Sequence, residues 1–403
     1  KQGNAYYAFD TPEELDEMRE RLKTEANPSP QYDRNARRHM RNSLTLSNDE
    51  VNGLLSRNVP HVVRILVPEN ETVQFTDMIR GEIRFETNVV DDKVLLKADG
   101  MPTYHLAVVV DDHLMQITHA FRGEEWLPSA PVHILLWEYL GWKDKMPQWA
   151  HLPLIMGPNG KLSKRDGSKY GFPVFAMNWT DPRTNEFTEG FRERGFLPQA
   201  FVNMLAMLGW NDGTEQELFS IEELIQKFSI ERVHKGGAKF DFEKAKWFNH
   251  EWIKKSDAES LKKEVQKLFT DKGVQVTDQI ISLVKDRCTL LSDFWQQASF
   301  FFFAPTEYDV NAVKPKWNEA KKDFFIALAE ELNATPDWQS AFIEAAFKQV
   351  AAIKNIKPGE LQLPFRIMLV GGKFGPPVFD IAEVIGKEET ISRINKALPL
   401  FLH

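Results

Sequence analysis

The chain has 403 residues, 42% of them hydrophobic, which is enough for about two to four domains with their own apolar cores. Its formal net charge is −8 at pH 7, so bulk charge gives no sign of nucleic-acid binding, and any contact with RNA must come from local basic patches. The single cysteine, Cys288, excludes an internal disulfide and a zinc site built from several cysteines. No apolar stretch reaches the ~18 residues that a membrane span requires, and no signal peptide is evident, so we expect a soluble, cytoplasmic protein.

The first part of the chain mixes helical and strand patterns. Thr11, followed by Pro12 and two glutamates, predicts the start of a helix that extends to about Lys23. Strands are expected in the runs 62–67, 77–85 and 94–96. An arginine-rich stretch at 31–42 could contact phosphate, and a solvated helix face is the alternative. Together these patterns predict an α+β region over residues 1–105.

A cationic turn in the middle of the chain is the strongest chemical signal. A buried helix pattern from Pro131 to Gly141 and a short apolar run precede it. The turn lies between glycines and holds Lys161, Lys164 and Arg165, a spacing that can direct three cations at one polyanion. Such a cluster suits a transferring phosphoryl group, whereas the alternative is the solvated tip of a hairpin.

The rest of the chain is predicted to be mainly helical. An amphipathic helix is expected from Leu197 to a stop at Gly209. Residues 253–403 show several apolar stripes at helical spacing and no alternating strand pattern. Core packing is the usual explanation of such stripes, and we adopt it here. These patterns predict an all-α C-terminal region.

Three blocks of sequence, in order, resemble those of one enzyme family. Residues 161–165, KLSKR, resemble the KMSKS signature of class I aminoacyl-tRNA synthetases. Upstream, the stretches 97–115 and 118–127 resemble the matching blocks of bacterial glutamyl-tRNA synthetases, in the right order and at the right spacing. The resemblance continues more loosely to the C-terminus. A five-residue motif alone would be weak, but three ordered blocks are specific.

The resemblance implies an α/β Rossmann-type catalytic domain with an α+β insertion, followed by an all-α anticodon-binding region. It assigns residues 1–105 to a connective insertion that contacts the tRNA acceptor end, 106–187 to the second half of the Rossmann domain, 188–252 to a helical stem-contact domain and 253–403 to the anticodon-binding domain. A class I synthetase opens with a strand and a HIGH-type motif, which we do not find. We therefore expect the N-terminal, HIGH-containing half of the catalytic domain to be missing.

The activity implied by the resemblance is that of a glutamate-tRNA ligase. Such an enzyme activates L-glutamate with ATP, releasing diphosphate, and transfers it to the 3′ end of tRNA-Glu with release of AMP. A helical C-terminal region favours glutamate over glutamine, because the glutaminyl-tRNA synthetases resembling this chain upstream end in β-barrels. Two alternatives stay open, namely a non-catalytic tRNA-binding paralogue and a non-discriminating enzyme that also charges tRNA-Gln. We expect Mg2+ to arrive with ATP, no zinc, no membrane partner and a monomer.

The resemblance also assigns residues to the ATP site. Lys161, Lys164 and Arg165 are expected to be catalytic cations that neutralise the triphosphate as it splits. Contacts with ATP are expected from Lys161, Ser163, Lys164, Arg165, Glu125, Leu154 and Ile155.

Glutamate has two carboxylates, so its pocket needs a guanidinium that can bind a carboxylate through two hydrogen bonds. The resemblance assigns this role to Arg122, with the hydroxyl of Tyr104 on the other flank. A surface ion pair of Arg122 with Glu124 or Glu125 is the structural alternative, as is a half-buried strand tyrosine at position 104. In the C-terminal region, Arg287 is expected to contact an anticodon base.

Overall fold

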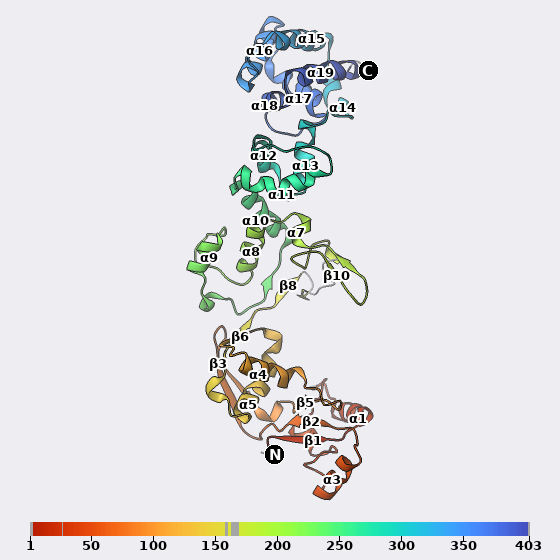
Figure 1. Cartoon of the computed structure of the whole chain (residues 1–403), viewed down its shortest axis with the longest axis vertical. Coiled ribbons are helices and arrows are strands. Elements are labelled where there is room, and N and C mark those ends of the chain that lie inside the picture. Colours follow the sequence, from red (N-terminus) through yellow and green to blue (C-terminus); the bar gives the residue numbers. More distant parts are fainter. Residues whose placement is uncertain (1–2, 26, 158–159, 163–168, 402–403) are drawn as a thin grey trace. The chain divides into compact units, whose positions relative to one another are not determined.

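The computed structural model describes residues 3–25, 27–157, 160–162 and 169–401 (Figure 1). By internal contacts the chain divides into two compact units. The first comprises residues 1–162, 206–217 and 223–240, and the second comprises 163–205, 218–222 and 241–403. Each unit has buried apolar clusters of its own. In the part of the chain that is described, no helix combines the length and the apolar character needed to cross a bilayer.

A four-stranded sheet is the centre of the first unit. Its strand order is β4-β3-β7-β6, with β3 at Thr72–Asp77, β4 at Gly81–Glu86, β6 at His119–Gly123 and β7 at Gln148–Leu152. Strands β6 and β7 are parallel and paired from His119 opposite Gln148 to Gly123 opposite Leu152. Since β3 and β4 precede residue 105 and β6 and β7 follow it, one sheet crosses the predicted boundary between the first two regions.

The helix between the two parallel strands is the best buried element of this unit. Helix α5 (Ala130–Tyr139) has Pro131 in its first turn and ends before Gly141, as the sequence predicts. Its apolar side chains are buried from Ala130 to Trp137 and pack with helix α4 (Tyr104–Leu114) and the sheet. A parallel strand pair needs such a crossover connection, so β6, α5 and β7 form one βαβ unit.

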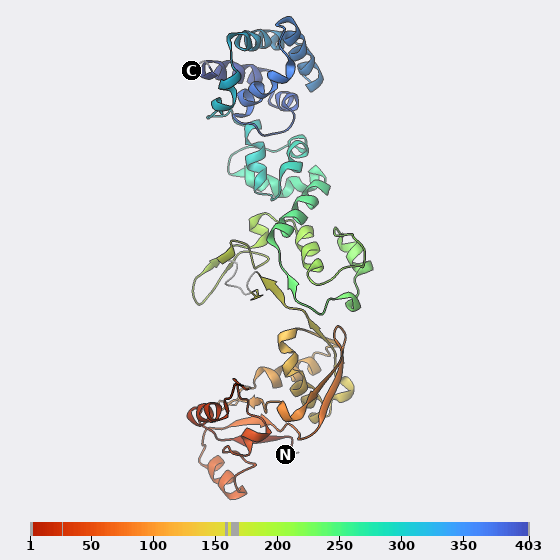
Figure 2. The same ribbon diagram turned by 180° about the vertical axis from the view of Figure 1, so that it is seen from behind.

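A second sheet lies at the N-terminal end of the first unit. Strands β1 (Ala5–Ala8), β2 (Val62–Ile65) and β5 (Val94–Leu96) pair antiparallel in that order. The helices here are α1 (Pro12–Leu22), α2 (Arg34–Arg37) and α3 (Asn48–Ser56), seen from behind in Figure 2. Helix α1 begins with a capping box between Thr11 and Glu14, which confirms the predicted helix start.

A small third sheet carries the start of the KLSKR motif. Strand β8 (Ile155–Gly157) pairs antiparallel with β9 (Gly160–Lys161) and parallel with β12 (Ala238–Lys239). The backbone N–H of Leu162 donates to the carbonyl of Ile155 at 2.8 Å. The first two residues of the motif are therefore anchored to the sheet, whereas Ser163, Lys164 and Arg165 lie outside the described residues.

The second unit is built mainly from helices, and it also contains a short hairpin of β10 (Trp179–Thr180) and β11 (Phe187–Thr188). Its α-helices before residue 300, including two that reach into the first unit, are α7 (Phe191–Arg194), α8 (Pro198–Met207), α9 (Ile221–Lys227), α10 (Phe242–Lys255), α11 (Ala258–Thr270), α12 (Asp278–Val284) and α13 (Asp293–Ala298). Those after it, teal to blue in Figure 1, are α14 (Val310–Val313), α15 (Glu319–Ala334), α16 (Ser340–Ile353), α17 (Gln362–Val370), α18 (Val378–Ile385) and α19 (Lys387–Ala397). Beyond residue 241 the described residues contain no β-strand, so the predicted helical C-terminal region is confirmed.

One local prediction in the first unit was wrong, and a second does not hold for one of its residues. The single strand expected at 77–85 is the end of β3, a turn and most of β4. The turn forms because Oδ1 of Asp77 accepts the backbone N–H groups of Ile79 and Arg80, at 3.0 and 2.9 Å. Within the arginine-rich stretch, Arg37 is neither solvated nor exposed to a ligand, because it is buried against Asp92 at 2.9 Å.

Candidate active site

The guanidinium of Arg122 is held in place from three elements. Arg122 lies on β6, and its side chain is 8% exposed. Its Nη1 donates to Nδ1 of His133 on α5 at 2.7 Å, and its Nη2 lies 3.3 Å from Oδ2 of Asp112 on α4. The guanidinium carbon lies 5.0 Å from the ring centroid of Trp149 on β7. Because of these contacts the predicted substrate-binding cation is a fixed group inside the fold, and its acidic partner is Asp112.

The ring of His133 is neutral, and its tautomer follows from its partners. Burial, and after it the positive charge of Arg122, lower the pKa of His133 to about 2. Arg122 can only donate, so Nδ1 of His133 accepts and the ring proton is on Nε2. That Nε2 lies 3.1 Å from Nδ1 of His105, whose pKa is also lowered by burial. His105 accepts this bond, and its own proton is therefore on Nε2.

Tyr104 begins helix α4 next to this histidine pair. Its ring centroid lies 6.2 Å from that of His133 and 4.5 Å from that of Trp126, and the residue is 45% exposed. Tyr104 is therefore a helical residue, and the alternative of a half-buried strand tyrosine is wrong. The structure brings the two predicted glutamate-binding residues next to one buried imidazole, with Arg122 buried and Tyr104 accessible.

The residues expected at the ATP site are also close to one another. Nζ of Lys161 lies 2.8 Å from Oε1 of Glu125, and both side chains are about half exposed. A hydrogen bond from Lys161 holds the pKa of Glu125 below its ordinary value. The backbone N–H of Leu154 lies 3.4 Å from Oε1 of Glu124, and the carbonyl of Ile155 accepts from Leu162. Four of the seven expected ATP contacts, Glu125, Leu154, Ile155 and Lys161, therefore lie in one region of the first unit.

The sequence analysis missed the polar groups that hold the residues of this region in place. Arg80 contacts Glu124 and donates to the carbonyls of His151 and Lys235, both at 3.2 Å. Arg80 is in turn positioned by the turn after Asp77. Burial by itself would raise the pKa of Asp77, but hydrogen bonds from His151 and from backbone N–H groups outweigh it and hold the pKa below the ordinary value. The only sequence signal was the Asp-to-Gly turn at 77–81.

Glu124 and Glu125 are therefore not partners of Arg122. Glu124 pairs with Arg80, and Glu125 pairs with Lys161. The alternative of a surface ion pair between Arg122 and these glutamates is wrong, because Arg122 turns inward to Asp112 and His133.

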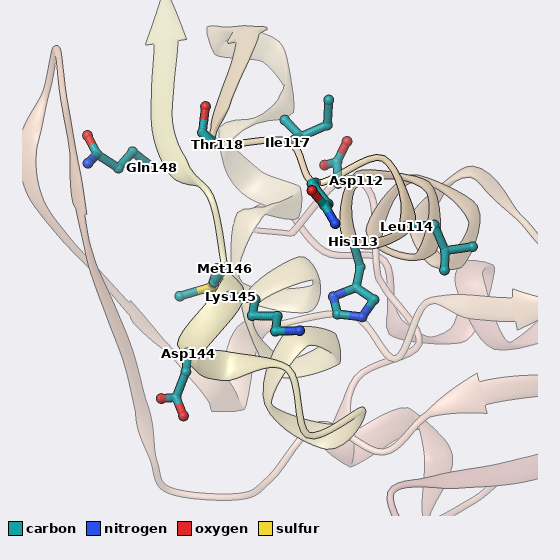
Figure 3. A pocket seen from close by; sticks show the side chains of 10 residues that line it. Asp112, His113, Leu114, Ile117, Thr118, Asp144, Lys145, Met146 and Gln148 are labelled. Carbon is teal, nitrogen blue, oxygen red and sulfur yellow. The ribbon is translucent and has the colours of Figure 1, made fainter.

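A cavity of about 570 Å³ lies next to Asp112, the acidic partner of Arg122 (Figure 3). Asp112 borders it together with His113, Lys145 and Gln148, and the ring of His113 stacks on Trp142 with a centroid distance of 3.9 Å. Arg122, Tyr104, Glu125 and Lys161 do not line it. Among the described residues, no group of three or more potential metal ligands is arranged to hold an ion.

In the second unit, Arg287 is exposed at the end of a short 3-10 helix, Lys285–Arg287. Burial, together with the neighbouring charge of Arg287, lowers the pKa of Arg366. Nη1 of Arg366 donates to the carbonyls of Phe374, Gly375 and Pro376, at 3.1, 3.1 and 2.6 Å. Two guanidinium groups therefore lie near one another, one anchored to a loop and one accessible.

Comparison with known families agrees with this arrangement. Residues 1–247 match the family described as tRNA synthetases class I (E and Q), catalytic domain, and residues 242–398 match an anticodon binding domain. The chain belongs to the class I tRNA synthetases of the E and Q group. The match to the catalytic domain of this family begins at residue 1, so it does not support the expectation that the first half of that domain is missing.

Individual relatives of this class I synthetase are glutamate-tRNA ligases. The enzyme of Flavobacterium johnsoniae is 49% identical over 403 residues, which cover 98% of this chain and 79% of the relative. That of Porphyromonas gingivalis is 46% identical over 405 residues, with 99% and 79% covered. The crystal structure of a glutamate tRNA ligase from Elizabethkingia meningosepticum, in complex with its amino acid, aligns with a TM-score of 0.92 at 43% identity and covers 99% of this chain and 80% of that one.

Proposed function

We propose that the chain is an ATP-dependent glutamate-tRNA ligase that attaches L-glutamate to the 3′ end of tRNA-Glu. One observation carries the proposal: relatives named glutamate-tRNA ligase align with almost the whole chain at 45–49% identity. The aligned region includes both the catalytic domain and the anticodon-binding domain. It favours an enzyme over a tRNA-binding paralogue without activity.

The proposed reaction has two steps. An oxygen of the α-carboxylate of glutamate attacks the α-phosphorus of ATP, and the bond to diphosphate breaks, leaving glutamyl-adenylate. The 2′-hydroxyl of the terminal adenosine of tRNA then attacks the glutamyl carbonyl, loses its proton, and displaces AMP. The first step develops negative charge on the diphosphate, and the second transfers an acyl group, so the protein mainly positions reactants and stabilises charge.

We assign the recognition of glutamate to Arg122 and Tyr104. A guanidinium has five N–H donors, and two of those of Arg122 are occupied by His133 and Asp112. The remaining donors can bind a carboxylate through two parallel hydrogen bonds, which an amide cannot accept equally well. The hydroxyl of the accessible Tyr104 would contribute one further bond.

We assign the neutralisation of the triphosphate to Lys161, with Ser163, Lys164 and Arg165 of the same motif. The ion pair between Lys161 and Glu125 is exposed on both sides, and such pairs stabilise by only about 0–1 kcal/mol. ATP can therefore separate the two residues at little cost, which releases Lys161 for phosphate and Glu125 for the adenosine half. Mg2+ usually binds through one or two carboxylates and the phosphates of its nucleotide, and the described residues offer no larger donor set.

We propose that tRNA is bound along both units. The match of residues 242–398 to an anticodon binding domain supports a role for Arg287 in reading a base of the anticodon. Contact of residues 1–105 with the acceptor end and of 188–252 with the stem are proposals based on the family resemblance. We also propose a cytoplasmic location, because the cytoplasm is where tRNA is charged.

A charging assay tests the proposal. The protein is incubated with ATP, Mg2+ and radiolabelled glutamate, and with tRNA-Glu or tRNA-Gln in separate reactions. We expect label on tRNA-Glu and none when labelled glutamine replaces glutamate. Label on both tRNAs would identify a non-discriminating enzyme. Binding of tRNA without any attachment of glutamate would overturn the proposed activity in favour of a binding protein.

A further inference from the structure

The buried imidazole of His133 accepts a hydrogen bond from the guanidinium of Arg122. The usual acceptor for a buried guanidinium is a carboxylate. His133 is fully buried on α5, and its Nδ1 accepts from Nη1 of Arg122 at 2.7 Å. A neutral acceptor orients the guanidinium without cancelling its charge, because imidazole contributes a lone pair and no negative charge. Among the described residues, the ion-pair partner of Arg122 is therefore Asp112, at 3.3 Å.

We propose that His133 is a positioning residue for glutamate, which fixes the plane of the Arg122 guanidinium, and that His105 fixes the tautomer of His133. The proposal rests on the proposed function, since it requires Arg122 to bind a carboxylate of the substrate. It adds to that function a residue that the sequence prediction did not assign and that does not touch the substrate itself.

Asp112 is the reason why positioning is needed. Its Oδ2 lies 3.3 Å from Nη2 of Arg122, which is longer than a strong charge-assisted hydrogen bond. Without the acceptor at Nδ1 of His133, the guanidinium can turn and form a bidentate pair with Asp112. Such a pair would neutralise Arg122 and occupy the donors that glutamate needs. His133 therefore keeps the guanidinium from pairing fully with its own carboxylate neighbour.

The tautomer of His133 depends on His105. If Nδ1 of His133 carried the proton, it would face the N–H of Arg122 donor to donor, and the bond would be lost. The bond from Nε2–H of His133 to Nδ1 of His105, at 3.1 Å, stabilises the tautomer in which Nδ1 is free to accept. The side chains of Arg122 on β6, of His105 and Tyr104 on α4 and of Trp149 on β7 lie around the ring. His151 on β7 is a further titratable group whose positive form lowers the pKa of His133.

Two variants of His133 separate positioning from packing. His133→Leu removes the acceptor, whereas the side-chain oxygen of His133→Asn can accept in nearly the place of Nδ1. In the charging assay with saturating tRNA, we expect His133→Leu to raise the KM for glutamate roughly ten- to hundredfold, the value of one charge-assisted hydrogen bond. The KM for ATP should change little, and kcat should change less than the KM for glutamate. His133→Asn should recover most of the loss.

His119→Leu is the matched control, because His119 is an exposed histidine on the same strand as Arg122. It should leave all three constants unchanged. An unchanged KM for glutamate in His133→Leu would overturn the proposal. So would equal damage in His133→Leu and His133→Asn, since packing alone would then explain the effect.

Nitrogen-15 NMR of histidine-labelled wild-type protein tests the tautomer and the charge of His133 without an activity measurement. This experiment still tests the proposal if the His133→Leu variant does not fold. We expect the His133 ring to carry its proton on Nε2 and to stay neutral from about pH 8 to about pH 5.5, below the ordinary pKa of histidine. A proton on Nδ1, or a charged ring in this range, would overturn the proposal. A wild-type protein that charges no tRNA with glutamate would instead overturn the proposed function and leave the NMR result standing.

Discussion

Nζ of Lys161 lies 2.8 Å from Oε1 of Glu125, so the first cation of the KLSKR motif is paired with a carboxylate from the 3-10 helix Glu124–Ser129, which follows β6 in the same unit. This exposed pair contributes little to the stability of the fold. Its two members were both expected to contact ATP. The pair therefore brings two expected ATP contacts together.

The first prediction concerns Lys161. We expect Lys161→Met to slow the formation of glutamyl-adenylate roughly ten- to hundredfold, because one charge-assisted contact with the phosphates is lost. The free energy of unfolding should change by less than about 1 kcal/mol. Glutamate-dependent exchange of diphosphate into ATP, with tRNA present, measures the first effect and urea unfolding the second. Lys239→Met is the control, since Lys239 is exposed in the same small sheet; equal rates for both variants would remove the role of Lys161.

The second prediction concerns the geometry of Arg122. Lysine keeps the charge but cannot bond His133, Asp112 and a substrate carboxylate from one planar group. We expect Arg122→Lys to raise the KM for glutamate roughly ten- to hundredfold in the charging assay, with a smaller effect on the KM for ATP. Arg84→Lys, at an exposed arginine of β4, should behave like wild type. A wild-type KM for glutamate in Arg122→Lys would show that charge alone suffices.

Sequence reasoning predicted those parts of the fold whose signals are local. Helix α1 was found from the Thr11 cap, and α5 from its apolar run between Pro131 and Gly141. The turn after Asp77 was missed because Ile79, Ile83 and Phe85 continue the alternation of β3 past the turn. The turn is instead dictated by hydrogen bonds from backbone N–H groups to the Asp77 carboxylate.

The site was predicted less completely, and the reason is distance along the chain. The motif resemblance identified Tyr104, Glu125, Arg122 and Lys161, which the structure brings into two local groups. His133 gave no signal, because a histidine within an apolar helix reads as part of the core. Its role depends on a contact between two elements that only the folded chain defines.

The third prediction concerns Asp77 and pH. The pKa of Asp77 is lowered in the folded chain, so its contribution to stability is present above its unfolded pKa of about 3.9 and is lost as the pH falls through the lower folded value. Asp77→Asn should lower the free energy of unfolding at pH 7 by roughly 2 kcal/mol, because bonds to a charged group are weakened. The difference from wild type should shrink below about pH 4. Urea unfolding at both pH values checks this; a constant difference would contradict it.

The fourth prediction compares two neighbouring arginines. Arg37 is buried, donates to Asp92 and also contacts Glu69, whereas Arg38 is 58% exposed and contacts Glu69. Arg37→Met leaves the buried carboxylate of Asp92 without its cation and should cost about 3–5 kcal/mol of unfolding free energy. Arg38→Met should cost less than about 1 kcal/mol. Chemical denaturation followed by circular dichroism compares them, and similar midpoints would mean that Asp92 finds another partner.

The fifth prediction concerns Arg287. If Arg287 reads an anticodon base, Arg287→Ala should lower kcat/KM for tRNA-Glu roughly tenfold and leave the KM values for glutamate and ATP unchanged. Lys267→Ala is the control, because Lys267 is an exposed cation on α11 that is paired with Glu264. Charging kinetics over a range of tRNA concentrations provide the measurement. Equal losses in the two variants would indicate nonspecific attraction of RNA.

The burial of Arg122 has a consequence for evolution and for engineering. The guanidinium that is proposed to choose the amino acid is packed between α4, α5 and β7, so the choice of substrate and the cohesion of the domain depend on the same atoms. A redesign toward a neutral or basic amino acid would have to rebuild that interior, with a replacement for the cation beside Asp112, before a new preference could emerge.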